Sequence, residues 1–163
     1  MLPFLVDMAR LFELFVAEWL QQHLPGTVMP RTQDVVRMGS TGYVEFRIDL
    51  TPHDADAGTC LAVMDTKYKI TDTPTSDDVA QIVAYAVAMG ARKGVLIYPR
   101  RLSLPFRAEV GGISVQAASF PIDGDVEAGG RGFVEEIAAV LARAHLTAQR
   151  RAFAIESDCR GPG

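Results

Sequence analysis

The sequence predicts a mixed α/β domain in which helices flank a central sheet. Two observations support this fold class: apolar residues recur at helical spacing near both ends of the chain, and alternating or continuous apolar segments between them indicate strands. With 163 residues, of which 48% are hydrophobic, the chain can bury the core of one domain. We expect this domain to cover residues 1–151, and residues 152–163, which end in ESDCRGPG, to form a disordered tail.

The first part of the chain predicts one helix and three strands. Phe4, Leu11 and Phe15 belong to a wide apolar stripe, and Pro25-Gly26 stops that helix. Alternating apolar residues and a polar stretch with Pro and Gly then indicate a hairpin. The expected elements are a helix at 4–20, strands at 27–38, 42–50 and 61–70, and a polar turn at 51–59.

The second part predicts a helix, two buried strands and a final helix. Ser76 is the expected N-cap of the first of these helices, and Gly90 is its expected C-terminal stop. The expected elements are a helix at 76–90, strands at 93–99 and 113–120, a Gly- and Asp-rich loop at 121–132, and an amphipathic helix at 133–151.

Charge and cysteine content narrow the function classes. The net charge of −4 argues against a chain that binds nucleic acid on its own, although a nuclease with an acidic metal site and a binding partner remains open. Two cysteines are too few for a disulfide framework or a structural zinc site, so we expect a reducing, cytoplasmic setting. No apolar run is long enough for a bilayer, and we expect no membrane association.

The segment LAVMDTKYKI at 61–70 places charged residues in an otherwise apolar strand. If the hairpin turn is centred near Ala57, partner residues have numbers that add to about 114, which places Asp49 opposite or diagonal to Asp65. Like charges at such a position are destabilising unless a divalent cation lies between them, and Mg²⁺ prefers oxygen ligands. Lys67 shares a strand face with Asp65 and can offset charge that develops on a phosphate. An ordinary surface ion pair is the alternative.

The helix that follows carries a second polar pair. Gln81 and Tyr85 are four residues apart, so they share one helix face. An amide and a phenol there could bind the sheet edge, the lysine or a DNA phosphate, but the same residues also suit an ordinary half-buried surface.

Together, Asp49, DTK at 65–67 and QIVAY at 81–85 resemble the PD-(D/E)xK nuclease superfamily, and the Gln-x3-Tyr pair is similar to its RecB-like branch. FELFV, MDTKYK, QIVAYA and VLIYP more closely resemble the nuclease domain of McrC, over roughly residues 4–120. McrC is the endonuclease subunit of McrBC, a system that restricts DNA containing modified cytosine. The resemblance therefore implies a restriction-endonuclease-like core, DNA as substrate and a McrB-like AAA+ GTPase as partner.

The resemblance also implies roles for individual residues. Asp49, Asp65 and the backbone carbonyl of Thr66 would bind Mg²⁺, with Mn²⁺ as a substitute, and Lys67 would assist catalysis. Gln81 and Tyr85 would position DNA or the site, and Glu13 would correspond to an acidic residue that some members carry on the first helix. By helical projection alone, Glu13 is equally well explained as a surface carboxylate.

Two departures from the family leave alternatives open. Residues 47–49 read Arg-Ile-Asp, where the motif has Pro before Asp. McrC proteins also usually carry a long segment ahead of the nuclease domain, whereas this sequence starts almost at the first helix. We therefore expect a fragment of a longer McrC or a compact relative. The alternatives are a RecB-like repair or defence nuclease without McrB, and an inactive, truncated assembly module.

Other polar residues are expected to have ordinary roles. We expect Lys69 to be solvated or to face a phosphate, and His53 to lie in a flexible polar turn. His145 lacks partners nearby in sequence and is expected on the surface. The arginine cluster after residue 99 could contact phosphates or form a solvated loop; its members are Arg100, Arg101 and Arg107.

Overall fold

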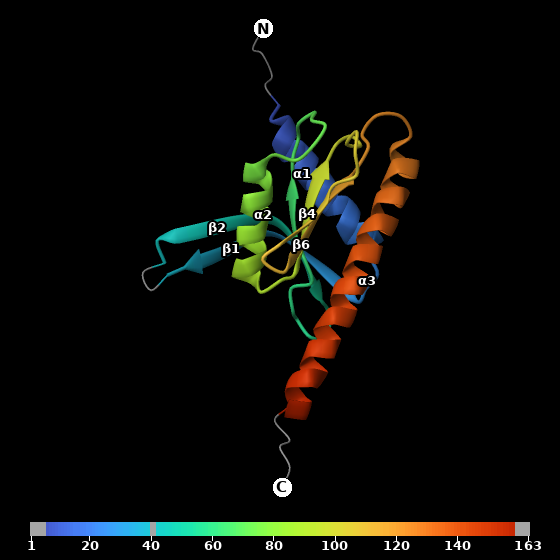
Figure 1. Cartoon of the computed structure of the whole chain (residues 1–163). Coiled ribbons are helices and arrows are strands. Elements are labelled where there is room, and N and C mark those ends of the chain that lie inside the picture. Colours follow the sequence, from blue (N-terminus) through green and yellow to red (C-terminus); the bar gives the residue numbers. More distant parts are fainter. Residues whose placement is uncertain (1–5, 40–41, 159–163) are drawn as a thin grey trace.

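The computed structural model describes residues 6–39 and 42–158. Within this part of the chain the helices and strands follow the predicted order, with β5 as an addition (Figure 1). The elements are α1 (Met8–His23), β1 (Val28–Met38), β2 (Val44–Asp54), β3 (Val63–Thr66), α2 (Ser76–Met89), β4 (Lys93–Tyr98), β5 (Arg107–Val110), β6 (Ile113–Ser119) and α3 (Val126–Asp158).

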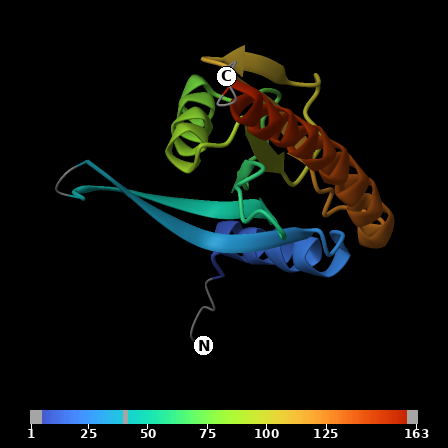
Figure 2. The same ribbon diagram turned by 90° about the horizontal axis from the view of Figure 1, so that it is seen from below.

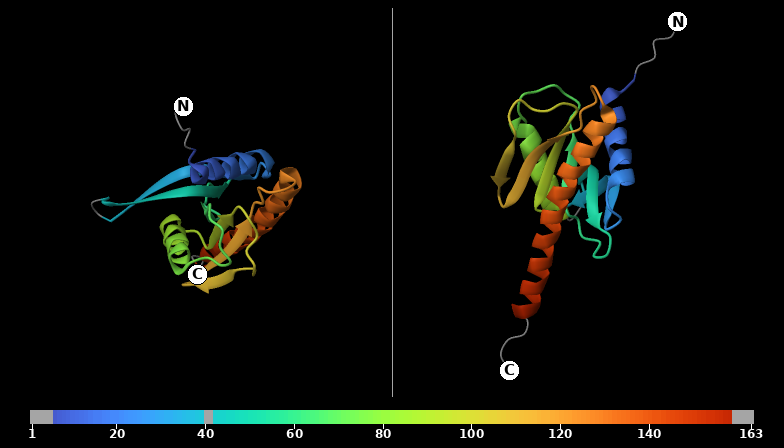
Figure 3. Two further views of the ribbon diagram at one scale, coloured as in Figure 1. Left: turned by 90° about the horizontal axis from the view of Figure 1, so that it is seen from above. Right: turned by 90° about the vertical axis from the view of Figure 1, so that its right-hand side faces the viewer.

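The strands form one six-stranded mixed sheet with helices on both faces. The strand order is β1-β2-β3-β4-β6-β5; β3, β4 and β6 run parallel, and the remaining pairs are antiparallel. One hydrophobic core lies between the sheet and α1 and α3, and a second lies between the sheet and α2 (Figure 3). This architecture confirms the predicted fold class, and it is compatible with a restriction-endonuclease-like fold.

The predicted hairpin register is confirmed. In the ladder between β2 and β3, Leu50 pairs with Met64, and their numbers add to the predicted value. Beyond this pair β2 continues into the hairpin with β1, whereas β3 pairs with β4. Asp49 and Asp65 would form the next pair in this register. The two strands therefore diverge at the position of these two aspartates.

Several boundaries differ from the prediction because tertiary contacts override local composition. β2 continues through Asp54 into the segment predicted as a turn, and the short, exposed edge strand β5 was not predicted. Helix α3 starts at Val126 and not at residue 133, since Gly130 packs directly against the ring of Trp19. It continues to Asp158, beyond the expected domain boundary at residue 151, and residues 159–163 lie outside the described part.

The ends of α2 follow the sequence closely. The N-cap is Thr75 and not Ser76, and its side chain accepts a hydrogen bond from the backbone N–H of Asp78. At the other end, Gly90 adopts the left-handed conformation that glycine tolerates best and closes the helix as predicted.

The hairpin of β1 and β2 projects from the body of the molecule (Figure 2). We call its outer part, residues 34–38 and 44–48, the arm. One face of the arm packs against the core under α2 through Val36, Phe46 and Ile48. Among the described residues, no helix is both long enough and apolar enough to cross a membrane.

Candidate active site

Asp49 lies at the fork between β2 and β3 and contacts β3 through its side chain. Its Oδ2 atom accepts hydrogen bonds from the backbone N–H and the hydroxyl of Thr66, each at 2.9 Å. The carboxylate thus takes the place of a backbone acceptor where the strands separate. All of its described contacts use Oδ2, so Oδ1 is left available to a further partner.

Asp65 and Lys67 form a short ion pair next to this fork. Lys67 Nζ lies 2.6 Å from Asp65 Oδ2, and Asp65 is almost completely buried. Burial raises the pKa of Asp65 to about 6, and the charges of Asp49 and Asp78 act in the same direction, whereas Lys67 opposes them. Apart from this ion pair, Asp65 Oδ2 has no hydrogen bond of ordinary geometry among the described residues.

The predicted pair on α2 meets Lys67. Lys67 Nζ donates to Gln81 Oε1 at 2.7 Å, and Gln81 Nε2 donates to the hydroxyl of Tyr85 at 2.7 Å. The ring of Tyr85 is buried and lies 5.4 Å from that of Phe46 on the arm. The sequence prediction that Gln81 and Tyr85 share one face is confirmed, and both belong to a chain of contacts that ends at Asp65.

Asp78 joins this network, although no role in the site was predicted for it from the sequence. Its Oδ2 accepts from Lys69 Nζ at 2.6 Å, and its Oδ1 lies 3.7 Å from Lys67 Nζ. Lys69 is therefore paired, contrary to the expectation that it is solvated. The Thr75-x-x-Asp78 spacing is a capping-box signal and could have identified this residue, since Asp78 also accepts the backbone N–H of Thr75.

The charges in this network shift one another's pKa. Burial alone would raise the pKa of Asp78, but hydrogen bonds from Lys69 and Thr75 outweigh it and lower that pKa. Burial would likewise lower the pKa of Lys67, but its hydrogen bond to Asp65 and the charges of Asp65 and Asp78 raise it. Lys67 is therefore positively charged at neutral pH.

Tyr98 brings a buried hydroxyl to the same region. Tyr98 follows Ile97 on β4, and the carbonyl of Ile97 accepts a hydrogen bond from the backbone N–H of Lys67. The hydroxyl of Tyr98 has no hydrogen-bond partner among the described residues. Burial raises the pKa of Tyr98, and the charges of Asp78 and Asp65 raise it further. The sequence offered only the VLIYP strand pattern as a signal for this residue.

Glu13 reaches the arm side of the site through Gln33. Gln33 Nε2 donates to Glu13 Oε1, and Arg10 also pairs with this carboxylate. Gln33 falls opposite Asp49 in the β1–β2 register and is the non-glycine residue with positive φ (55°) in the described chain. Glu13 thus contacts β1, which pairs with the strand that carries Asp49, and its described partners are Arg10 and Gln33.

The two aspartates have the oxygen donors that Mg²⁺ prefers, and Asp65 offers a buried oxygen without an ordinary hydrogen bond. Across residues 6–39 and 42–158, no group of three or more His, Cys, Asp or Glu side chains is placed to hold a metal ion. The residues present therefore suit a cation with two carboxylate ligands, the remaining positions being taken by backbone carbonyl, water or phosphate oxygen.

The histidines differ from their predicted positions. His53 is buried in β2 and not in a flexible turn: its ring nitrogens contact the carbonyl of Gly58 and the hydroxyl of Thr51. His145 has a partner distant in sequence, since its Nδ1 lies 2.6 Å from Asp54 Oδ2. Both pairings depend on tertiary structure, which sequence spacing did not indicate.

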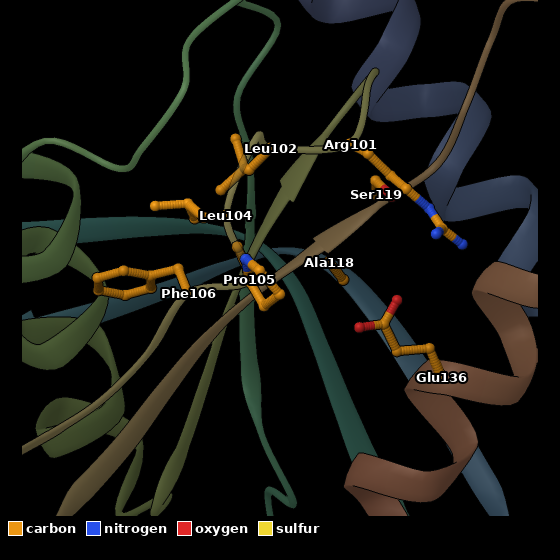
Figure 4. Close-up of a pocket in the computed structure, with 9 residues that line it drawn as sticks. Arg101, Leu102, Leu104, Pro105, Phe106, Ala118, Ser119 and Glu136 are labelled. Carbon is orange, nitrogen blue, oxygen red and sulfur yellow. The ribbon is translucent and has the colours of Figure 1, made fainter.

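Of the predicted arginine cluster, Arg101 lines a separate pocket of about 310 Å³ beside the end of β6 (Figure 4). Arg101 and Glu136 line the same side of it, and Arg100, which pairs with Asp123, is not among its lining residues. Burial raises the pKa of Glu136, while the charges of Arg101 and Arg107 counteract this shift. None of the predicted site residues lines this pocket.

Fold and site together define a class of protein: a mixed α/β domain, compatible with a restriction-endonuclease-like fold, in which a carboxylate–lysine cluster lies where two central strands diverge. The family model described as McrBC 5-methylcytosine restriction system component matches residues 1–99, more than half of the chain. The chain therefore belongs to this family, in agreement with the McrC resemblance. A search among curated proteins found no match.

Proposed function

We propose that this restriction-system component is its Mg²⁺-dependent DNA endonuclease, equivalent to McrC. The observation that supports this most strongly is the cluster of Asp65 and Lys67, 2.6 Å apart, beside Asp49 at the fork. Metal-assisted phosphodiester hydrolysis needs carboxylates that hold a cation and a positive charge near the phosphate, and these residue types supply both.

Each residue then has a defined task. Asp49 and Asp65 would hold the cation, and the chemistry it would supply is polarisation of a phosphoryl oxygen and activation of water. Lys67 places its positive charge beside the phosphate, where negative charge develops. Gln81 is a positioning residue, because it holds the ammonium group of Lys67 and is itself fixed by Tyr85.

The raised pKa of Asp65 favours a catalytic role over an assembly module. A carboxyl group whose pKa lies near 6 because of burial is less stable when ionised than it would be in water. Carboxyl groups with such shifts are concentrated in functional sites, and a cation bound there would stabilise the ionised form.

Plasmid nicking with and without Mg²⁺ tests the proposal, with Mn²⁺ as a substitute. Asp65→Ala should abolish nicking, whereas Asp77→Ala, an exposed carboxylate on α2, should leave it intact. Nicking that persists in Asp65→Ala would exclude Asp65 from the reaction. Calorimetry gives an independent check, since Mg²⁺ binding should require both Asp49 and Asp65.

We further propose a McrB-like AAA+ GTPase as partner, on the basis of the family alone. Addition of such a GTPase with GTP should stimulate cleavage of DNA that contains 5-methylcytosine over unmodified DNA. Equal cleavage of both substrates, with or without the GTPase, would instead favour a RecB-like nuclease that acts without McrB.

A further inference from the structure

The arm has an outer face that no described helix covers. Strand residues alternate between faces, so Arg47 and Glu45 point away from the side on which Phe46 packs against Tyr85. Arg37 shares this outer face as the ladder partner of Glu45. The side chains of Arg37 and Arg47 are 69% and 65% exposed.

The arm is continuous with the strand that carries Asp49 of the proposed active site. Arg47 precedes Asp49 by two positions on β2, which corresponds to about 7 Å along a strand. A phosphodiester bound near Asp49 therefore has its neighbouring phosphates within reach of the arm. An extended two-stranded ribbon is also a shape that can lie along a DNA groove.

The charges of the outer face suit phosphate. Glu45 pairs with both arginines, with Arg37 Nε at 3.2 Å and Arg47 at 3.8 Å. Exposed ion pairs of this kind contribute little to stability, so phosphate oxygens can replace the carboxylate at small cost. On the arm, two guanidinium groups accompany the one carboxylate of Glu45, in a chain whose net charge is −4.

We propose that the outer face of the arm binds the DNA backbone beside the cleaved bond through Arg37 and Arg47, and that Glu45 holds both side chains in place in the free protein. This inference rests on the proposed function, because DNA is the substrate there. It assigns the arm a task that the catalytic cluster does not perform: the arm holds the phosphates that flank the reacting one.

Fluorescence anisotropy with a labelled DNA duplex in EDTA tests the arm separately from cleavage. Arg47→Gln and Arg37→Gln should each weaken binding several-fold and reduce the salt dependence of affinity by about one phosphate contact. Glu45→Gln should tighten binding, because it removes a negative charge from the same surface. The matched control is Arg131→Gln, an exposed arginine on α3, which should bind like the wild type.

The arginine variants should weaken DNA binding and Glu45→Gln should tighten it. Misfolding cannot explain both changes, since a damaged fold would not bind DNA more tightly. Thermal unfolding of each variant provides the second check. Affinity and salt dependence in Arg37→Gln and Arg47→Gln equal to those of Arg131→Gln would overturn the arm proposal. The endonuclease proposal fails by a different result, namely nicking that does not depend on Asp65.

Discussion

The ammonium group of Lys67 donates a 2.7 Å hydrogen bond to the side-chain carbonyl of Gln81, although 14 positions separate the two residues. The amide of Gln81 in turn donates to Tyr85, which fixes which end of the amide faces Lys67. The orientation of the lysine thus depends on α2 as well as on β3.

The first prediction concerns this orientation. Gln81→Leu removes the acceptor for Lys67 without removing any charge, so nicking should fall by about 10- to 100-fold, as for other residues that orient a ligand or catalytic group. Tyr85→Phe should have a smaller effect, since Gln81 keeps its bond to Lys67. A Gln81→Leu enzyme with wild-type kcat would show that the contact does not matter for catalysis.

The second prediction separates two adjacent carboxylates on α2. Asp78→Asn keeps a side-chain oxygen for the cap but removes the charge that faces Lys67 and Lys69, so the pKa of Lys67 should fall. NMR titration of the lysine side chain measures this directly. Asp77→Asn is the matched control because Asp77 is exposed, and it should leave the titration of Lys67 unchanged. Equal titration in the two variants would contradict the network.

The third prediction concerns pH and stability in EDTA. The pKa of Asp65 is raised from 3.8 to about 6, so the folded protein binds this proton more tightly than the unfolded chain does. The contribution of Asp65 to stability therefore falls as pH rises from about 4 to about 6. Asp65→Asn lacks this fall, and its stability relative to the wild type should improve by at most about 3 kcal/mol across that window.

Urea unfolding of both proteins at pH 4 and pH 7 measures this difference. Comparison of the two proteins is necessary because Asp54 and Asp78 have lowered pKa values and change stability in the opposite direction. A pH-independent difference between wild type and variant would mean that Asp65 titrates normally.

The fourth prediction compares two glycines of α3. A Cβ atom at Gly130 would lie 2.2 Å from the ring of Trp19, so Gly130→Ala should destabilise the protein by about 1–3 kcal/mol. At Gly132 there is open space, and Gly132→Ala should stabilise the helix by about 0.5–1 kcal/mol. Thermal unfolding distinguishes the two signs, and a stable Gly130→Ala protein would show that α3 does not pack closely on α1.

Local patterns carried enough information to predict the central hairpin. The turn near Ala57 and the alternation of β2 fixed the pairing of Leu50 with Met64, because a shift by one residue would expose one apolar face. The same register placed Asp49 and Asp65 at adjacent positions on neighbouring strands. Gln81 and Tyr85 followed from helical spacing alone.

Features that depend on distant contacts could not be predicted in this way. The glycines of α3 resemble a loop until Trp19 is placed against Gly130. His53 contacts the carbonyl of Gly58 in the turn after β2. His145, on α3, pairs with Asp54, which is distant in sequence. The left-handed backbone of Gln33 beside Asp49 has no local sequence signal, since glutamine rarely adopts this conformation.

The divergence of β2 from β3 has a thermodynamic consequence. Asp49 belongs to the same continuous strand as the arm, whereas Asp65 belongs to the body of the sheet. If the arm moved when it bound DNA, the separation of the two carboxylates would change, and so would their affinity for the proposed cation. Because such coupling between two binding sites is reciprocal, binding of the cation would change the affinity for DNA by the same factor.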